Sequence, residues 1–225
     1  MRSSVGQLNW LAGITRPDLS FDVCQFCSKV TTAVVEDLIQ LNKVIHRARR
    51  QKVSIVFPKI NFQKVRLTTY ADASFNNLPN GGSQEGHIIF INDDKNNYAP
   101  LSWVSNRIKR VVRSTLAAKA IALNNACEDA IYLGKMISML SMDNPTIPIV
   151  AFTDNKSTLD TINSSTSVSD KKLRLEIALL RETQERKEVE IMKVPGKDNI
   201  SDVLTKRGAS SKSLLLAITR GNLGT

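Results

Sequence analysis

The sequence predicts a mixed α/β fold, in which a five-stranded sheet is flanked by helices and preceded by a helical extension. Apolar residues recur at helical spacing, without strand signals, up to about residue 52. Beyond that point, segments rich in β-branched residues follow at short intervals, and helix and strand patterns then alternate to the C-terminus. We therefore expect a helical segment over residues 1–52 and a layered α/β domain over residues 53–225.

The N-terminal segment carries the signals of three helices. The first has Val5, Leu8 and Leu11 at helical spacing and breaks at Gly13, and Pro17 suits the first turn of the second. The third helix ends in a basic cluster, made of Arg47, Arg49, Arg50 and Lys52. Cations are favoured at a helix C-terminus by the helix dipole, and they are also available to nucleic acid, so the cluster has two interpretations.

The order of strands and helices beyond this segment predicts a sheet led by three antiparallel strands. Strand patterns occur in KVSIVF, KVRLTTYAD, GHIIFIND and APLSWVS, and glycine-rich or DDKNN turns separate the later segments. A long helix is expected from about Ser114 to Leu140, with Ser114 or Thr115 as its N-cap. The remaining expected elements, in order, are the strand IPIVAFTD, the helices KSTLDTINSS and SDKKLRLEIALLRETQERKEV, the strand VEIMKVP, and closing helices in DNISDVLTKR and SSKSLLLAITRG.

The charge balance favours a polyanionic partner. The 225 residues include 31 lysines and arginines against 21 acidic residues, a formal net charge of +10, and nucleic acid is the commonest partner of such a chain. A basic protein without a specific partner is the alternative. Aromatic residues make up only 5% of the chain, which argues against an extensive base-stacking platform. No apolar run approaches the roughly 20 residues of a membrane span, so no membrane association is expected.

The cysteines indicate an intracellular protein, cytoplasmic or nuclear rather than secreted. Their odd number and the absence of a signal peptide favour free thiols, at Cys24, Cys27 and Cys127. Cys24 and Cys27 form a CxxC motif within an apolar helical stretch, and we interpret them as buried core residues rather than zinc or redox ligands. His87 follows a glycine-rich turn and is interpreted as a surface residue rather than a catalytic one.

Three aspartates occur where distant segments could converge at one edge of the sheet. Asp72 lies in TTYADAS, Asp154 in IVAFTDNKS and Asp202 in PGKDNISDVLTK. Magnesium prefers oxygen ligands, and a pair of such ions requires several carboxylates. An aspartate after a single strand is weak evidence, but the contexts of all three together are specific.

These contexts resemble the RNase H domain of copia-type LTR retrotransposons. The family's motifs look like YADAS, RSTLAAE, TDN and ADxLTK, and this chain reads YADAS, RSTLAAK, FTDN and SDVLTK. The opening segment SSVGQLNWLAGITRPDL is similar to the end of the family's reverse transcriptase. The resemblance implies a reverse-transcriptase remnant over residues 1–52, an RNase H-like domain over residues 53–225, and magnesium held by Asp72, Asp154 and Asp202 as catalytic residues.

The chain departs from the family at one position, because Lys119 stands where the family has a metal-binding glutamate. No neighbour on the same helix face is acidic, and Glu128 falls on the opposite face. The nominal charge of the site therefore changes from −4 to −2, and an ammonium near these carboxylates would compete with metal. The alternative is that Lys119 swings outward and only a ligand is lost.

A basic run precedes this helix, and its members are Arg107, Lys109, Arg110 and Arg113. In a nuclease of this type it would lie near the phosphates of the substrate and position the strand without reading its sequence. The alternative is a strand edge protected by charge.

The resemblance implies a magnesium-dependent endonuclease that cuts RNA in RNA–DNA hybrids, and Lys119 implies that this activity is impaired. The polymerase's catalytic aspartates would lie upstream, so DNA synthesis is not expected. Two alternatives stay open, a non-catalytic nucleic-acid-binding module and an inert pseudogene product. No small-molecule substrate is expected, and the sequence does not specify an oligomeric state.

Overall fold

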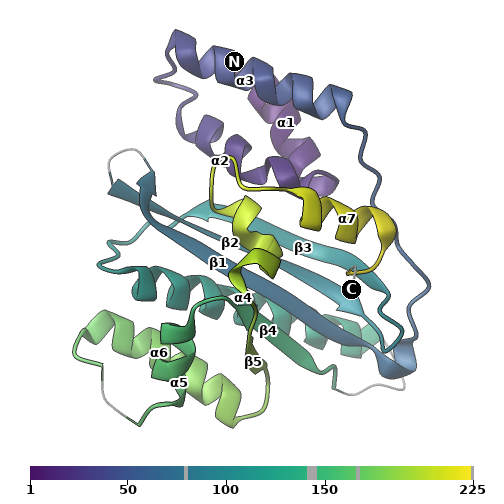
Figure 1. Cartoon of the computed structure of the whole chain (residues 1–225), viewed down its shortest axis with the longest axis vertical. Coiled ribbons are helices and arrows are strands. Elements are labelled where there is room, and N and C mark those ends of the chain that lie inside the picture. Colours follow the sequence, from purple (N-terminus) through teal and green to yellow (C-terminus); the bar gives the residue numbers. More distant parts are fainter. Residues whose placement is uncertain (79–80, 141–145, 166–167, 224–225) are drawn as a thin grey trace.

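A five-stranded mixed sheet forms the centre of the computed structural model (Figure 1). The structure describes residues 1–78, 81–140, 146–165 and 168–223. The strands lie in the order β3-β2-β1-β4-β5, and their bounds are β1 (Arg66–Leu78), β2 (Gly82–Asn92), β3 (Tyr98–Arg107), β4 (Ile149–Thr153) and β5 (Glu190–Lys193). The first three strands pair antiparallel, whereas β4 is parallel to both β1 and β5. The predicted sheet, led by three antiparallel strands, is confirmed.

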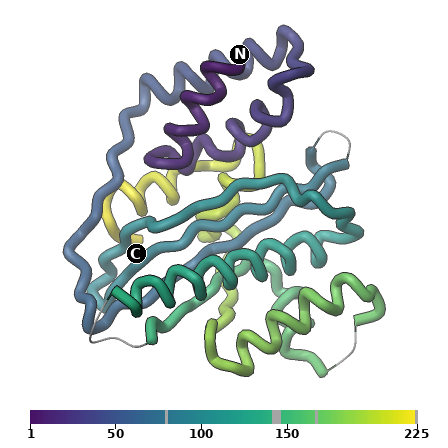
Figure 2. The backbone as a smooth tube through the Cα atoms, turned by 180° about the vertical axis from the view of Figure 1, so that it is seen from behind, coloured from purple at the N-terminus to yellow at the C-terminus, as the bar shows by residue number. Residues whose placement is uncertain are grey.

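Helices cover both faces of this sheet. Their bounds are α1 (Arg2–Ile14), α2 (Ser20–Ser28), α3 (Val35–Arg50), α4 (Thr115–Leu140), α5 (Lys156–Asn163), α6 (Lys171–Glu185) and α7 (Lys212–Arg220). Short 3-10 helices are η1 (Pro17–Leu19), η2 (Phe62–Lys64), η4 (Gly196–Asp198) and η5 (Ile200–Leu204). Figure 2 shows α4 running along the sheet on the side that also carries α5 and α6. The opposite face is covered by η5 and α7.

Alternation along the strands builds a separate hydrophobic core on each face. Leu67 and Ile89 point toward α4, whereas Tyr70, Ile88 and Phe90 point toward η5 and α7. All five side chains are buried. The two cores fix the register of β1 against β2, because a slip of one residue would exchange the two faces.

The N-terminal helices form a third apolar cluster that packs against the edge strand β3. Val5, Leu8, Val23 and Leu41 belong to this cluster. The indole N–H of Trp103 in β3 donates to the backbone carbonyl of Ala12 at 2.7 Å, which fixes α1 to the sheet. The three helices lie where the sequence predicts them, and the domain boundary at residue 52 stays a prediction.

Two expected elements differ from the structure. KVSIVF (residues 52–57) is not a strand. Pro58 follows it directly, and the N–H of Val56 donates to the carbonyl of Ile218 in α7 at 2.8 Å instead of to a strand. The DNISDVLTKR segment forms the 3-10 helix η5 rather than an α-helix.

The environments predicted for Cys27 and His87 are wrong. Cys27 is exposed and Cys24 half-buried, because α2 turns Phe21, Val23 and Phe26 inward instead. Of the three cysteines only Cys127 is buried, and burial raises the pKa of its thiol to about 12.

His87 lies within β2 rather than in a turn, and only 2% of it is exposed. Its Nε2 is 3.0 Å from Oδ2 of Asp129 in α4. The histidine therefore ties β2 to α4 instead of lying on the surface.

Gly86 allows η5 to approach the sheet closely. It lies opposite Asp72 in the β1–β2 register. A Cβ at this position would lie 2.6 Å from Cβ of Leu204 and 3.0 Å from Cγ2 of Thr205. Only a residue without a side chain leaves room for this contact.

We expect Gly86→Ala to lower the free energy of unfolding by about 1–3 kcal/mol, because the added methyl group overpacks the η5 contact. Urea denaturation followed by circular dichroism measures this. Gly6→Ala is the matched control, since nothing lies within 4 Å of a Cβ there and alanine is the better helix former. Equal stability of Gly86→Ala and the unmodified chain would contradict the close approach.

Candidate metal and nucleic-acid site

The three aspartates singled out in the sequence meet at one edge of the sheet. Asp72 lies in β1, and Asp154 directly follows the parallel neighbour β4, where Ala71 and Thr153 are paired. Asp202 comes from η5 on the face opposite α4. One carboxylate oxygen from each aspartate lies within 4.8 Å of the others, so the group has the size of a metal site.

Lys119 reaches into this group instead of swinging outward. Its Nζ is 2.9 Å from Oδ1 of Asp72 and forms a close ion pair with Oδ1 of Asp154. Only 12% of the lysine side chain is exposed. The start of its helix is fixed by Ser114, whose hydroxyl oxygen accepts a hydrogen bond from the N–H of Ala117 at 3.1 Å.

A second lysine, Lys206, was missed by the sequence reasoning. Its Nζ lies 2.9 Å from Oδ1 of Asp202 and 3.2 Å from Oδ2 of Asp72. The spacing of four residues between Asp202 and Lys206 was the available signal, because residues four apart share a helical face. Three carboxylates and two ammonium groups leave the cluster with a net charge of −1.

Backbone and hydroxyl groups hold the carboxylates in place. The hydroxyl of Thr205 donates to Oδ2 of Asp72 at 2.5 Å. The hydroxyl of Ser74 donates to the carbonyl of Thr205 at 2.8 Å, and the amide of Asn199 donates to the carbonyl of Ala71 at 3.2 Å. These contacts join η5 to β1 on both sides of Asp72.

The pKa values at the site favour the charged forms of both lysines. Burial alone would raise the pKa of Asp72, but the ammonium groups of Lys119 and Lys206 hold that pKa below its usual range. Burial would likewise lower the pKa of each lysine, but the carboxylates outweigh it and raise both pKa values. Burial, together with the charge of Asp72, raises the pKa of Asp202.

The residues present do not fit a pair of divalent ions. The carboxylates offer the oxygen ligands that magnesium requires. Asp72 and Asp154 are already paired with Lys119, however, and Asp202 is paired with Lys206. A divalent ion would have to displace an ammonium group and would be repelled by it.

In the basic run before α4, two residues form ion pairs and two form none within the described parts of the chain. Arg110 lies 2.7 Å from a carboxylate oxygen of Glu176. Arg113 lies 3.9 Å from one of Asp170. Arg107 and Lys109 form no ion pair with the residues that the structure describes, although all four cations are exposed. In the basic cluster at the end of α3, Arg47 is paired with Asp22 at 2.6 Å.

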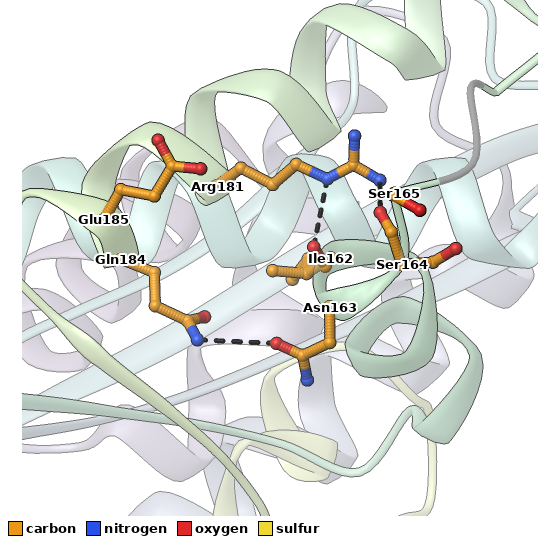
Figure 3. Close-up of a pocket in the computed structure, with 7 residues that line it drawn as sticks. All are labelled: Ile162, Asn163, Ser164, Ser165, Arg181, Gln184 and Glu185. Atoms are coloured by element: carbon orange, nitrogen blue, oxygen red, sulfur yellow. Dashed lines mark hydrogen bonds between the residues drawn. The ribbon is translucent and has the colours of Figure 1, made fainter.

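A separate cavity of about 480 Å³ lies between α5 and α6, and Arg181, which lines it, has a structural role (Figure 3). The Arg181 guanidinium donates to the backbone carbonyls at the end of α5, including those of Thr161 at 2.7 Å and Ile162 at 3.0 Å. These are the carbonyls that a helix leaves unpaired at its C-terminus. Arg181 therefore caps α5.

Known proteins resemble the chain along most of its length. The retrovirus-related Pol polyproteins from the Arabidopsis thaliana transposons RE1 and RE2 are 26% and 24% identical over 208 and 207 residues, 91% of this chain in both cases. The chain is a homologue of these Pol polyproteins. This confirms the resemblance predicted from its motifs. The chain spans 14% of the length of either curated relative. No family model matches it.

The five-stranded mixed sheet with flanking helices confirms the fold class predicted from the sequence. Among solved structures, the N-terminal RNase H domain of a Mycobacterium tuberculosis protein has a TM-score of 0.47 and 17% identity, and the match covers 63% of this chain and 91% of that one. None of the described helices is long and apolar enough to cross a membrane.

We expect Lys119→Met to lower the free energy of unfolding by about 2 kcal/mol. A partner removed from a fully buried ion pair costs about 3–5 kcal/mol, and the remaining access of solvent reduces this effect. Chemical denaturation at neutral pH measures it. Lys135→Met, an exposed change on the same helix, should stay within about 0.5 kcal/mol. Equal effects of the two changes would show that the Lys119 ion pairs contribute nothing to stability.

Proposed function

We propose that this chain is an RNase H-like, nucleic-acid-binding protein whose metal-dependent cleavage of RNA in RNA–DNA hybrids is weak or absent. The position of the Lys119 ammonium between Asp72 and Asp154 carries the proposal. Homology to transposon Pol polyproteins supports the ancestry of the site. The net charge of +10 supports the choice of partner.

The magnitude of the electrostatic effect favours a strongly weakened metal site. A pair of unit charges about 4 Å apart is worth about 4 kcal/mol at an intermediate effective dielectric constant. Catalytic metal pairs lie about 3.5–4 Å apart, so both ions would need the carboxylates that Lys119 and Lys206 already contact. Magnesium would therefore compete for these ligands at a disadvantage.

Binding does not require the metal site. Contacts to phosphate position a nucleic acid without reading its sequence, and exposed cations near the site can supply them. Arg107 and Lys109 are available for this, since neither is paired with a carboxylate in the described parts of the chain. Arg110 and Arg113 would have to exchange their present partners, Glu176 and Asp170.

We expect the unmodified chain to bind a labelled RNA–DNA hybrid at low salt and to leave its RNA strand intact. Gel analysis with magnesium, and separately with manganese, tests cleavage, and fluorescence anisotropy at several salt concentrations tests binding. Electrostatic binding should weaken steeply as salt rises. Efficient cleavage with magnesium would refute the impaired site. Absence of binding at low salt would favour the inert alternative.

We expect Lys119→Glu to increase the affinity for magnesium and to restore some cleavage. The change removes a competing cation and adds a fourth carboxylate, so the apo variant should be less stable and magnesium should raise its melting temperature. Calorimetric titration and thermal denaturation measure these effects separately from activity. Lys119→Gln is the control, because it removes the cation without adding a charged ligand. A Lys119→Glu variant with no gain in metal binding would show that the site is altered beyond this position.

A further inference from the structure

Arg107 is exposed, and its side chain also lines a cavity. The cavity has a volume of about 220 Å³ and lies between α2 and the ends of β1 and β3. Its lining includes Arg107 and Lys29, with the polar side chains of Gln25, Ser28 and Thr32. We call it the junction pocket. Its lining combines two cationic groups with hydroxyl and amide groups, which is suitable for an oxyanion.

We propose that the junction pocket binds a phosphodiester group of a nucleic-acid strand that also passes the aspartate cluster. This inference rests on the proposed binding of nucleic acid and identifies where one strand is held. It also gives the helical N-terminal segment a role, because Lys29 comes from that segment and Arg107 from the sheet.

Gly82 leaves open the space that the guanidinium of Arg107 occupies. A Cβ on Gly82 would lie 2.8 Å from both Nε and Nη2 of Arg107, so the guanidinium occupies the space that a side chain would fill. The guanidinium has five N–H donors. No ion pair or side-chain hydrogen bond uses them among the residues that the structure describes, so they are available to a ligand.

Lys29 and its neighbours leave the pocket positively charged. The Lys29 ammonium donates to Oδ1 of Asp37 at 2.6 Å, which uses one of its three donors. Two cations therefore face one carboxylate, and Arg207, which also acts electrostatically on Asp37, adds a further positive charge. A bound phosphate group would neutralise the remaining positive charge of the pocket, and Asp37 could keep its contact with Lys29.

A buried chain of hydrogen bonds supports the floor of the pocket. The amide of Gln25 donates to Oε1 of Gln84 at 3.3 Å, and the amide of Gln84 donates to the hydroxyl of Ser105 at 3.0 Å. Ser105 in turn donates to the carbonyl of Leu204 at 2.6 Å. Leu204 precedes Thr205, the residue whose hydroxyl contacts Asp72. The pocket and the aspartate cluster are therefore built on one connected framework.

The pocket also lies on the same face of the sheet as Asp72. Ser74, Gln84 and Arg107 are aligned across β1, β2 and β3, and Asp72 lies two residues before Ser74. Two strand spacings and two residues of rise separate Asp72 from Arg107 by roughly 12 Å. This distance corresponds to about three base steps at 3.4 Å each. A single strand can thus contact both places.

The test compares three variants for affinity toward a labelled RNA–DNA hybrid over a range of salt concentrations. Arg107→Gln removes the guanidinium, and Gly82→Ala displaces it without changing the net charge. We expect each to weaken binding about tenfold at low salt. The slope of log affinity against log salt should fall by about one for Arg107→Gln. Lys95→Gln, an exposed change in the β2–β3 hairpin, should bind nearly as the unmodified chain does.

The possible outcomes distinguish failure of the pocket assignment from failure of the proposed function. If the unmodified chain does not bind hybrid, the proposed function fails. If it binds and neither Arg107→Gln nor Gly82→Ala weakens binding more than Lys95→Gln, the pocket assignment alone is overturned. Thermal denaturation verifies that each variant is folded, and Gly82→Ala should fold because only the flexible end of Arg107 must shift. Stabilisation by inorganic pyrophosphate that depends on Arg107, with unchanged hybrid affinity, would assign the pocket to a free anion and overturn the strand contact.

Discussion

Lys119 joins elements that the chain brings together from distant positions, because its backbone lies in α4 while its ammonium contacts Asp72 in β1 and Asp154 after β4. Buried carboxylates at a sheet edge repel one another unless a cation lies between them. In a metalloenzyme, bound metal ions can supply that cation. Here two lysine side chains supply it from within the chain.

An internal cation has a different consequence for function from a bound metal. A metal ion can coordinate a substrate oxygen and leave coordination positions open, whereas an ammonium group offers only hydrogen-bond donors. Lys119 therefore pairs the carboxylates without supplying Lewis-acid chemistry. The proposed phosphate contacts do not involve these carboxylates, so binding and cleavage are separable under the proposed function.

The sequence was sufficient for the order of the elements, which depends on local patterns, and for the convergence of the aspartates, which the resemblance to a known family implied. Strand patterns in residues 66–107 predicted three antiparallel strands, and the motif contexts predicted that Asp72, Asp154 and Asp202 would meet. The same patterns were misleading at KVSIVF, where β-branched residues suggested a strand although Pro58 and a contact to α7 exclude it.

Properties that depend on tertiary contacts were not predictable in this way. Lys206 enters the cluster because η5 lies flat on the sheet, and this approach depends on the space at Gly86. His87 is buried because α4 crosses β2, which no local signal around the glycine-rich turn reveals. Exposure of Cys27 likewise follows from which face of α2 meets the rest of the chain.

The parallel pairing of β1 with β4 has a kinetic consequence. The first three strands are linked by hairpins and can form early, whereas β4 joins β1 only after the long helix α4 has crossed between them. The ion pair of Lys119 with Asp154 spans 35 residues and needs β4 in place beside β1, so we expect it to form late in folding. Contacts absent from the folding transition state act mainly on the rate of unfolding. Lys119 therefore acts mainly on the rate of unfolding, so it determines how long the assembled sheet edge persists rather than how quickly it forms.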